Sequence, residues 1–308
     1  MLTCLLLIAS NFVNIFGSKL ISGLQIVPPQ VKYGINPDAF NSHGNEYFSN
    51  YVQYNDDDEG FIWEKSGLYE GDIMTYSNEI RNGILNETLR WPNATIPFYI
   101  EEDHFSDDEL LVIMSAMLEY HEKTCLRFKP YNSKDENWVV VTGNREGCWS
   151  SVGMQNEGGQ QLNVNSPKCV KKGTVIHEFL HAAGFAHQHS SSNRDDYIEI
   201  VWENILDGHE SNFKKYNKSI VTDYGTSYDY ESIMHYSRKA FSKNGNDTII
   251  PLRNVTQLGQ RDKFSLNDVY KLNRMYNASC HKPETESKER ESNTDFESTI
   301  KWFETLFN

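Results

Sequence analysis

Hydrophobic and polar residues alternate most clearly between residues 95 and 164, where the pattern predicts a series of short strands. Most of these runs are rich in β-branched and aromatic side chains, which favour a pleated, half-buried surface. They cover residues 95–100, 126–131, 138–142, 149–153 and 161–164. We therefore expect a sheet in this part of the chain.

Three stretches follow helical spacing instead. The first opens with the capping-box pattern Ser106-Asp107-Asp108-Glu109, and a hydrophobic face follows it. That face consists of Leu110, Ile113, Met114, Met117, Leu118 and His121. A second helix is expected from about residue 172 and a third over residues 265–275. Strands followed by separate helices and a long irregular part predict an α+β fold.

The two ends of the chain differ in character from this middle part. Residues 1–18 contain a short apolar run typical of a secretory signal peptide, and it is too short to span a membrane. Residues 19–81 carry the acidic run 56–59 and little periodicity, so we expect a separate, poorly structured segment there. Residues 281–308 form a charged tail in which Phe296, Ile300, Phe303 and Phe307 fall at helical spacing. These side chains either dock on another surface or belong to a frayed tail with a transient helix, and we favour the second interpretation.

Charge and cysteine content narrow the class of protein. The net charge of −14 excludes nucleic-acid binding, because phosphates require a basic surface. No later segment is apolar enough to cross a membrane. Four cysteines lie outside the expected signal peptide (Cys125, Cys148, Cys169 and Cys280). An even number in an exported chain predicts two disulfides, for which three pairings are possible.

Six N-glycosylation sequons agree with export. Each has Thr or Ser two residues after the asparagine, and they lie at Asn86, Asn93, Asn217, Asn246, Asn254 and Asn277. Such sequons are common by chance, so export rests on their combination with the apolar start and the cysteines. We expect a secreted, extracellular glycoprotein.

The most informative motif is H-E-F-L-H-A-A-G-F-A-H at residues 177–187. His177 and His181 are four residues apart, so a helix presents both imidazoles on one face. Gly184 allows the helix to end in a left-handed turn that brings His187 round as a third ligand. Three ligands with an open fourth position, and Glu178 beside them as a base, are typical of one catalytic Zn²⁺.

Several further segments resemble the astacin family of zinc metalloendopeptidases, a branch of the metzincins. S-I-M-H-Y at 232–236 matches the family's Met-turn, and T-C-L-R-F at 124–128 and G-C-W-S-S-V-G at 147–153 match its cysteine segments. Y-E-G-D at 69–72 resembles the inhibitory F-x-G-D motif of astacin propeptides, with Tyr69 in place of Phe. R-W-P-N at 90–93 lies where the mature enzyme begins its first strand. The resemblance covers roughly residues 69–280.

The resemblance implies a two-lobed metzincin fold. It has a twisted mixed sheet with helices in the N-terminal lobe and an irregular C-terminal lobe that ends in a late helix. It also implies four regions: a signal peptide (1–18), an inhibitory propeptide (19–81), a catalytic domain (82–280) and a charged tail (281–308). The implied disulfides are Cys125–Cys280 and Cys148–Cys169.

The activity implied is hydrolysis of proteins or peptides by a zinc-activated water. Zinc bound by three histidines lowers the pKa of that water, and Glu178 accepts its proton. Met234 lies beneath the zinc ligands in the family, where a thioether fills an apolar gap. Tyr236 corresponds to the tyrosine that ligates zinc at rest and stabilises the oxyanion during turnover.

The resemblance also implies latency. Asp72 is expected to bind the zinc in place of the water until the propeptide is removed. The expected cut lies between Arg81 and Asn82, which suggests a trypsin-like activating protease as a partner.

The chain departs from the family after its third histidine. Gln188 replaces the usual Glu, which contacts the freed N-terminus in mature astacins, and a neutral amide accepts a weaker hydrogen bond. The family's usual Arg is absent from the following residues, and we expect His189 to face solvent. Two other functions remain possible from the sequence: a secreted binding protein on the same scaffold and a structural zinc module. The intact ligands and the base Glu178 favour the peptidase.

Overall fold

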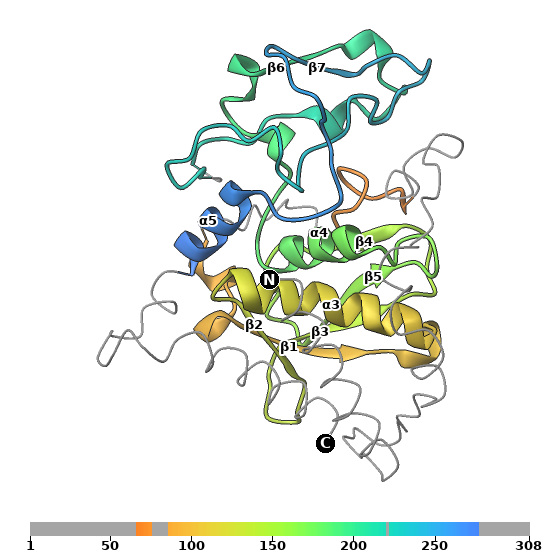
Figure 1. Cartoon of the computed structure of the whole chain (residues 1–308), viewed down its shortest axis with the longest axis vertical. Coiled ribbons are helices and arrows are strands. Elements are labelled where there is room, and N and C mark those ends of the chain that lie inside the picture. Colours follow the sequence, from red (N-terminus) through yellow and green to blue (C-terminus); the bar gives the residue numbers. More distant parts are fainter. Residues whose placement is uncertain (1–65, 76–85, 220–221, 277–308) are drawn as a thin grey trace, which may run out of the picture. The chain divides into compact units, whose positions relative to one another are not determined.

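The computed structural model describes residues 66–75, 86–219 and 222–276, shown in colour in Figure 1. All of them belong to one of the two compact units of the chain, residues 59–287. The signal-peptide region, the cleavage site, Cys280, Asn277 and the tail lie outside the described residues. No helix in the described ranges is long and apolar enough to cross a membrane.

The first half of the described chain contains a five-stranded sheet. Its strands are β1 (Thr95–Ile100), β2 (Arg127–Pro130), β3 (Trp138–Thr142), β4 (Cys148–Ser150) and β5 (Gly159–Val164). They are arranged in the order β2-β1-β3-β5-β4, and only β4 runs antiparallel to its neighbour. The register aligns Phe98 with Val139 and Val141 with Leu162. The mixed sheet expected from the resemblance is therefore present.

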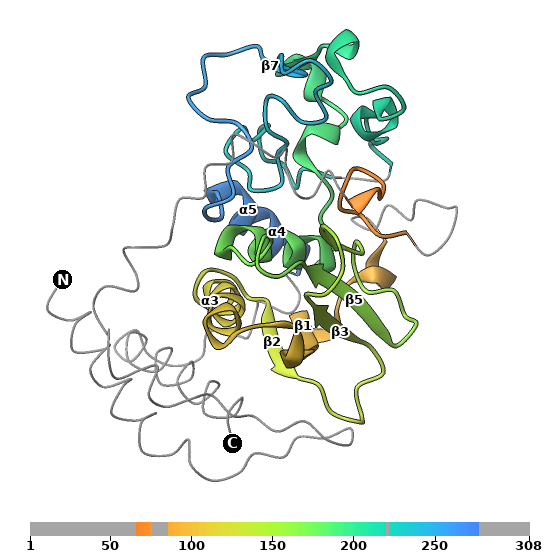
Figure 2. The ribbon, with the colours of Figure 1, turned by 90° about the vertical axis from the view of Figure 1, so that its right-hand side faces the viewer.

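Two helices, α3 (Asp107–Lys123) and α4 (Lys172–Ala182), lie on the same side of this sheet (Figure 2). Helix α3 begins at the expected capping box: the Ser106 hydroxyl accepts from the Glu109 backbone, and the Glu109 carboxylate accepts from the Ser106 backbone. The core between helices and sheet consists of fully buried apolar side chains from both layers. These include Ile96, Ile113, Met117, Val139, Val141, Leu162, Val175, Ile176 and Phe179.

The described residues after His187, up to residue 276, contain little regular structure (Figure 1, teal to blue). Two three-residue strands, β6 (Ile198–Ile200) and β7 (Ile249–Pro251), pair antiparallel. The late helix α5 (Leu266–Met275) has Ser265 as its N-cap, in agreement with the helix predicted over residues 265–275. Short 3-10 helices occur at Glu87–Leu89, Pro92–Ala94, Glu102–His104, Gln188–Ser190, Arg194–Asp196, Trp202–Asn204 and Glu210–Phe213.

Two differences from the sequence prediction concern strands. The strand expected at 149–153 ends at Ser150, because the next residues turn toward helix α4, where the Gly153 amide donates to the His181 carbonyl at 2.9 Å. Strands β6 and β7 were not predicted. Each has only three residues, too few to show a period-2 pattern, and their partners lie far apart in the sequence.

Candidate metal centre

Helix α4 supplies the first two histidines. His177 and His181 lie on one face, with ring centroids 4.8 Å apart, and both are buried. The helix runs very close to the segment before α5: a Cβ on Gly173 would lie 1.7 Å from the Arg261 carbonyl oxygen. Glycine at this position therefore allows the second half of the chain to pack directly against the metal-binding helix.

Gly184 brings the third histidine to the same place. Its φ of 111° lies in the region that L side chains rarely adopt, so the chain leaves the helix axis here. The Phe185 amide then donates to the Leu180 carbonyl at 3.0 Å, which closes the end of the helix. His187 follows, fully buried, with its ring centroid 4.7 Å from that of His181. The turn expected at Gly184 is present.

Each of the three rings has an oxygen partner for Nδ1. His177 faces the Ile233 carbonyl at 2.8 Å, and His181 faces the Phe185 carbonyl at 2.7 Å. His187 faces a carboxylate oxygen of Glu70 at 2.8 Å. Because these oxygens accept hydrogen bonds, each Nδ1 carries a proton, and Nε2 is the ring nitrogen left to bind a metal. The Nε2 atom of each of the three rings is therefore available to bind a metal ion.

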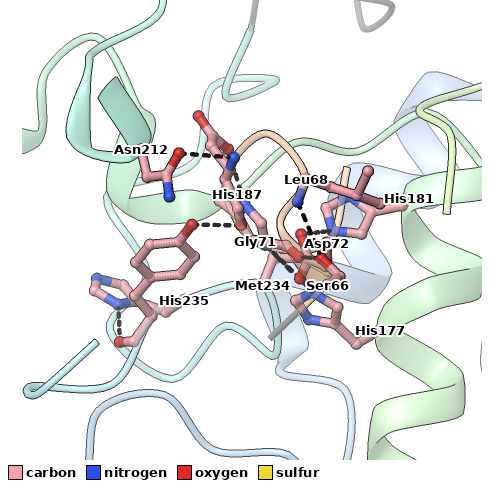
Figure 3. A network of polar contacts seen from close by, with 12 residues as sticks. Ser66, Leu68, Gly71, Asp72, His177, His181, His187, Asn212, Met234 and His235 are labelled. Atoms are coloured by element: carbon pink, nitrogen blue, oxygen red, sulfur yellow. Dashed lines mark hydrogen bonds and ion pairs between the residues drawn. The ribbon is translucent and has the colours of Figure 1, made fainter. Parts of the chain in front are cut away.

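The carboxylate of Asp72 lies among these Nε2 atoms (Figure 3). Its Oδ2 is 3.1 Å from His177 Nε2 and 3.2 Å from His187 Nε2, and its Oδ1 is 3.4 Å from His181 Nε2. Burial raises the pKa of Asp72, but the adjacent imidazoles of His187 and His181 outweigh it and hold the pKa well below its usual range. Asp72 is therefore an ionised carboxylate. Burial lowers the pKa of His187, but the charge of Asp72 outweighs it and raises that pKa to about 9.

The four side chains fit a zinc ion. Their ligand atoms all lie within 4.8 Å of one another, and every one of the residues is buried. Three imidazole nitrogens and one carboxylate oxygen are ligands that zinc accepts in tetrahedral sites. His181 Nε2 and Asp72 Oδ1 have no hydrogen-bond partner although they are buried, which is expected of atoms that bind a metal.

The loop that carries Asp72 is fixed by Glu70, a residue that the sequence did not single out. Glu70 is fully buried, and its second carboxylate oxygen accepts from the Ser190 hydroxyl at 2.9 Å. Its amide donates to the Asn212 side chain at 3.0 Å. Glu70 (φ 46°) and Gly71 (φ 82°) are both left-handed and turn the chain sharply before Asp72. An acidic residue in an irregular segment gives no sequence pattern by which these contacts could be anticipated.

The same loop pairs with the edge of the sheet. The Ser150 amide of β4 donates to the Asp72 carbonyl, and the Met74 amide donates to the Ser150 carbonyl, both at 2.9 Å. Ile73 and Ser150 form a parallel bridge. The loop therefore occupies the free edge of β4, and a free strand edge is a place where an extended peptide can add as a further strand.

Glu178 lies one residue beyond the first histidine and is 1% exposed. Neither of its carboxylate oxygens has a hydrogen-bond partner among the described residues. Burial raises the pKa of Glu178 well above its ordinary value, and the negative charge of Asp72 raises it further. A buried carboxyl group with an elevated pKa is suited to accept and return a proton.

Met234 and Tyr236 of the Met-turn are both buried, at 2% and 0% exposure. Figure 3 shows Met234 close to the histidine cluster. The Tyr236 hydroxyl donates to the Glu70 carbonyl at 2.5 Å, so in this structure the phenol contacts the loop that carries Asp72. Its ring centroid lies 4.8 Å from that of His187.

His189 corrects one expectation. We predicted that it faces solvent, but it is fully buried and stacks on Tyr236 with ring centroids 3.6 Å apart. Its Nε2 lies 2.9 Å from the Asn212 carbonyl. Burial lowers the pKa of His189 well below its ordinary value, so the ring is neutral. The polar residues around it suggested a solvated loop, whereas packing against distant aromatic residues decides its position.

Gln188 has a partner on helix α5. Its side-chain oxygen accepts from the Lys271 ammonium group at 2.7 Å, and Lys271 is 7% exposed. The amide that replaces the family's usual carboxylate is therefore bound to an internal cation in this structure.

Of the expected disulfides, Cys148–Cys169 is present, with 5.7 Å between the Cα atoms. Cys125 is also disulfide-bonded, and its expected partner, Cys280, lies outside the described residues. Five of the six sequon asparagines are exposed: Asn86, Asn93, Asn217, Asn246 and Asn254.

Comparison with known families decides the class of this site. Residues 83–277 match the family model described as "Astacin", which is a family of peptidases. The chain belongs to the astacin family of zinc peptidases.

Individual proteins and one solved structure are also similar to this chain. The chain is 40% identical over 224 residues to seminal metalloprotease 1 of Drosophila melanogaster, covering 70% of this chain and 89% of the relative. It is 44% identical over 214 residues to human meprin A subunit beta, covering 69% of this chain but only 30% of that protein. Among solved structures, it is similar to high choriolytic enzyme 1, a hatching enzyme zinc-protease from Oryzias latipes. That match has a TM-score of 0.56 and 36% identity and covers 61% of this chain and 92% of the other.

The family match begins at residue 83, after the loop that carries Asp72. Asp72 therefore reaches the histidines from outside the matched region.

Proposed function

We propose that this astacin-family peptidase is a secreted endopeptidase made as a latent proenzyme. Residues 19–81 would be the propeptide and residues 82–280 the catalytic domain. The observation that carries the proposal is the position of the Asp72 carboxylate among His177, His181 and His187. A carboxylate bound there takes the coordination position that catalysis requires to be open.

In the active enzyme, the three histidines would hold the zinc and Glu178 would be the general base. Zinc, when bound, supplies a Lewis acid that activates water and polarises the scissile carbonyl. Glu178 would accept a proton from the attacking water and return it to the leaving amine. Its burial and its elevated pKa support this role. Substrates would be proteins or peptides that add in extended form to the edge of β4.

Tyr236 would donate a hydrogen bond to the oxyanion that forms during peptide hydrolysis. In this structure its hydroxyl donates to the Glu70 carbonyl, a contact that ends when the propeptide leaves. Removal of residues 19–81 would therefore release Asp72 and Tyr236 together.

The proposed activating cut lies between Arg81 and Asn82, outside the described residues, and a trypsin-like protease would make it. The cysteines and the exposed sequons support passage through the secretory pathway, with residues 1–18 as the signal peptide. N-terminal sequencing of the active enzyme tests the cut, and a start far from Asn82 would refute this site.

The decisive experiment for latency is Asp72→Ala in the full chain, kept uncut by inhibitors of serine proteases. We expect the uncut variant to cleave a generic protein substrate and the uncut wild type not to do so. A zinc chelator should abolish the activity. Asp108→Ala, at an exposed position on the first turn of α3, is the matched control and should remain latent.

Two results would contradict the proposal. One is uncut wild-type protein that is as active as the trypsin-treated enzyme. The other is an uncut Asp72→Ala protein that remains inactive although trypsin activates it fully.

A further inference from the structure

The N-terminus of helix α5 carries a carboxylate with more partners than a helix cap requires. Asp268 is the N3 residue of the capping box at Ser265 and is 2% exposed. Its Oδ2 accepts from the Ser265 amide at 3.0 Å, which completes the box. The same side chain makes two further hydrogen bonds outside its own helix.

Both of these bonds hold the Met-turn. Asp268 Oδ1 accepts from the Ser232 hydroxyl at 2.6 Å, and Oδ2 accepts from the Ile233 amide at 2.9 Å. Ser232 and Ile233 are fully buried, so water does not compete for these donors. Hydrogen bonds to an ionised carboxylate are roughly twice as strong as neutral ones. The first residues of the turn are therefore firmly fixed to α5.

The Met-turn also contacts the zinc ligands. The Ile233 carbonyl accepts from His177 Nδ1 at 2.8 Å, so the peptide unit next to the one bound by Asp268 orients this ring. The Met234 amide donates to the Ser232 hydroxyl oxygen at 3.1 Å. The Met234 carbonyl accepts from the Gln188 amide at 2.9 Å, directly after His187 in the chain. Two of the three histidines are thus connected to Asp268 through residues 232–234.

One helical turn further along α5, Lys271 makes a parallel connection. Its ammonium group donates to the Gln188 side chain at 2.7 Å. Residues three apart lie on the same face of a helix, so Asp268 and Lys271 both face the metal centre. Helix α5 contributes no ligand, yet it binds the Met-turn through Asp268 and the Gln188 side chain through Lys271.

We propose that Asp268 is a positioning residue of the zinc site. Its carboxylate fixes the Ser232–Met234 turn, and the turn fixes the orientation of the His177 imidazole and of the chain at His187. Asp268 touches neither the metal nor a substrate. Groups that orient metal-ligating histidines change metal affinity by about 10- to 100-fold when they are removed. Asp268 acts through one intervening peptide, so we expect an effect near the lower value.

The competing explanation is that Asp268 only caps its helix. Ser265 distinguishes the two, because Ser265→Ala removes the cap hydroxyl but leaves both bonds from Asp268 to the Met-turn. Loss of an N-cap side chain lowers the stability of the helix. A capping role therefore predicts the same zinc affinity for Asp268→Ala and Ser265→Ala, and a positioning role predicts different affinities.

The experiment measures zinc affinity in the full chain by competition with a chromophoric chelator, together with the visible spectrum of the Co²⁺-substituted protein. We expect Asp268→Ala to raise the Kd for zinc about tenfold and to change the Co²⁺ bands. Asp268→Asn should restore the affinity to within about threefold. Its amide oxygen can still accept from the Ile233 amide, and its NH₂ can donate to the Ser232 oxygen. Ser265→Ala should leave the Kd and the spectrum unchanged while it lowers the melting temperature.

Ser232→Ala tests the same connection from the turn side without altering α5, in case Asp268→Ala does not fold. It should also weaken zinc binding. Equal zinc affinity in Asp268→Ala and Ser265→Ala would overturn the proposal, and so would unchanged affinity in both Asp268→Ala and Ser232→Ala. Zinc binding is read out directly, so neither result depends on whether the proenzyme is latent.

Discussion

Glu178 is held in an environment that opposes its charge. It is buried, its oxygens have no hydrogen-bond partner among the described residues, and the ionised Asp72 lies nearby. An unpaired buried carboxyl group is costly to a folded protein. Such a residue is retained where it acts on the reacting atoms, and bound zinc would supply the missing positive charge.

Replacing Glu178 with Gln keeps the size of the side chain and removes the base. We expect kcat to fall by about 10²- to 10⁴-fold, the usual contribution of a general base. Zinc content should remain at one ion per chain, because Glu178 is not among the ligand atoms. The measurement is cleavage of a quenched peptide by the activated enzyme, with zinc determined by elemental analysis.

Glu119→Gln is the matched control for this change. Glu119 is also a buried glutamate, on helix α3, but it is paired with Lys123 and Lys172 at 2.7 Å and does not reach the metal centre. Its replacement should affect stability and not kcat. Full activity of Glu178→Gln would refute the assignment of the base.

Sequence patterns predicted correctly the residues whose role follows from local spacing. His177, His181 and His187 follow from the period of one helix and one glycine turn. The patterns missed Glu70, and they placed His189 wrongly, because the partners of both are distant in the chain. Burial of a polar side chain depends on three-dimensional packing, which a single acidic or histidine position does not reveal.

At the scale of elements, the start signals of the helices were reliable. Ser106 and Ser265 both act as N-caps with complete capping boxes, because four consecutive residues are enough to make those bonds. Strand ends were less predictable, since a strand ends where its partner ends. The pairing of β4 with the loop at Asp72 and the β6–β7 ladder are examples that depend on distant residues.

The connection between α3 and β2 should make stability depend on pH. His121, in the last turn of α3, accepts a hydrogen bond on Nε2 from the Phe128 amide at 2.8 Å, so the ring is neutral. Burial, with a contribution from Arg127, lowers the pKa of His121 to about 3. In the unfolded chain the pKa is about 6.5. Below pH 6.5 the unfolded state therefore takes up a proton that the folded state does not.

His121 consequently has no effect on stability above pH 6.5 and destabilises the fold as the pH falls from 6.5 toward 3. The contribution reaches at most about 1.4 kcal/mol per pH unit. His121→Gln keeps an acceptor for the Phe128 amide and removes the titration, so its free energy of unfolding should fall less steeply with acidity. Urea unfolding at pH 7, 6 and 5 measures the difference. If the free energy of unfolding falls equally with acidity in both proteins, the lowered pKa of His121 is contradicted.

At the scale of the whole molecule, the metal centre joins segments that are far apart in the sequence. Its four candidate ligands come from the loop at Asp72, helix α4 and the turn at His187, and α5 holds the backbone beside them. The order of the elements in the sequence predicted the α+β class. It did not predict that these distant segments meet at one site. Only the family resemblance indicated that Asp72 would reach the histidines.

Removal of zinc should therefore destabilise the whole fold. A ligand at a thousand times its Kd stabilises the folded state by about 4 kcal/mol, and this stabilisation is lost when a chelator removes the metal. For a domain of this size we expect the melting temperature to fall by about 10 °C. Calorimetry with and without chelator measures the shift. His181→Ala, which lacks one ligand, should melt at a temperature that changes much less with chelator.

The bonds between the Asp72 loop and β4 have a consequence for how inhibition would end. The loop uses the same strand edge that an extended substrate would need, so the two compete for one set of backbone groups. Before the proposed cut, the loop is part of the same chain and is present at the edge at an effective concentration on the order of millimolar. After the cut, its concentration is only that of the free peptide. A single cleavage outside the metal centre would then open the site through dilution, without any change in the affinity of the loop itself.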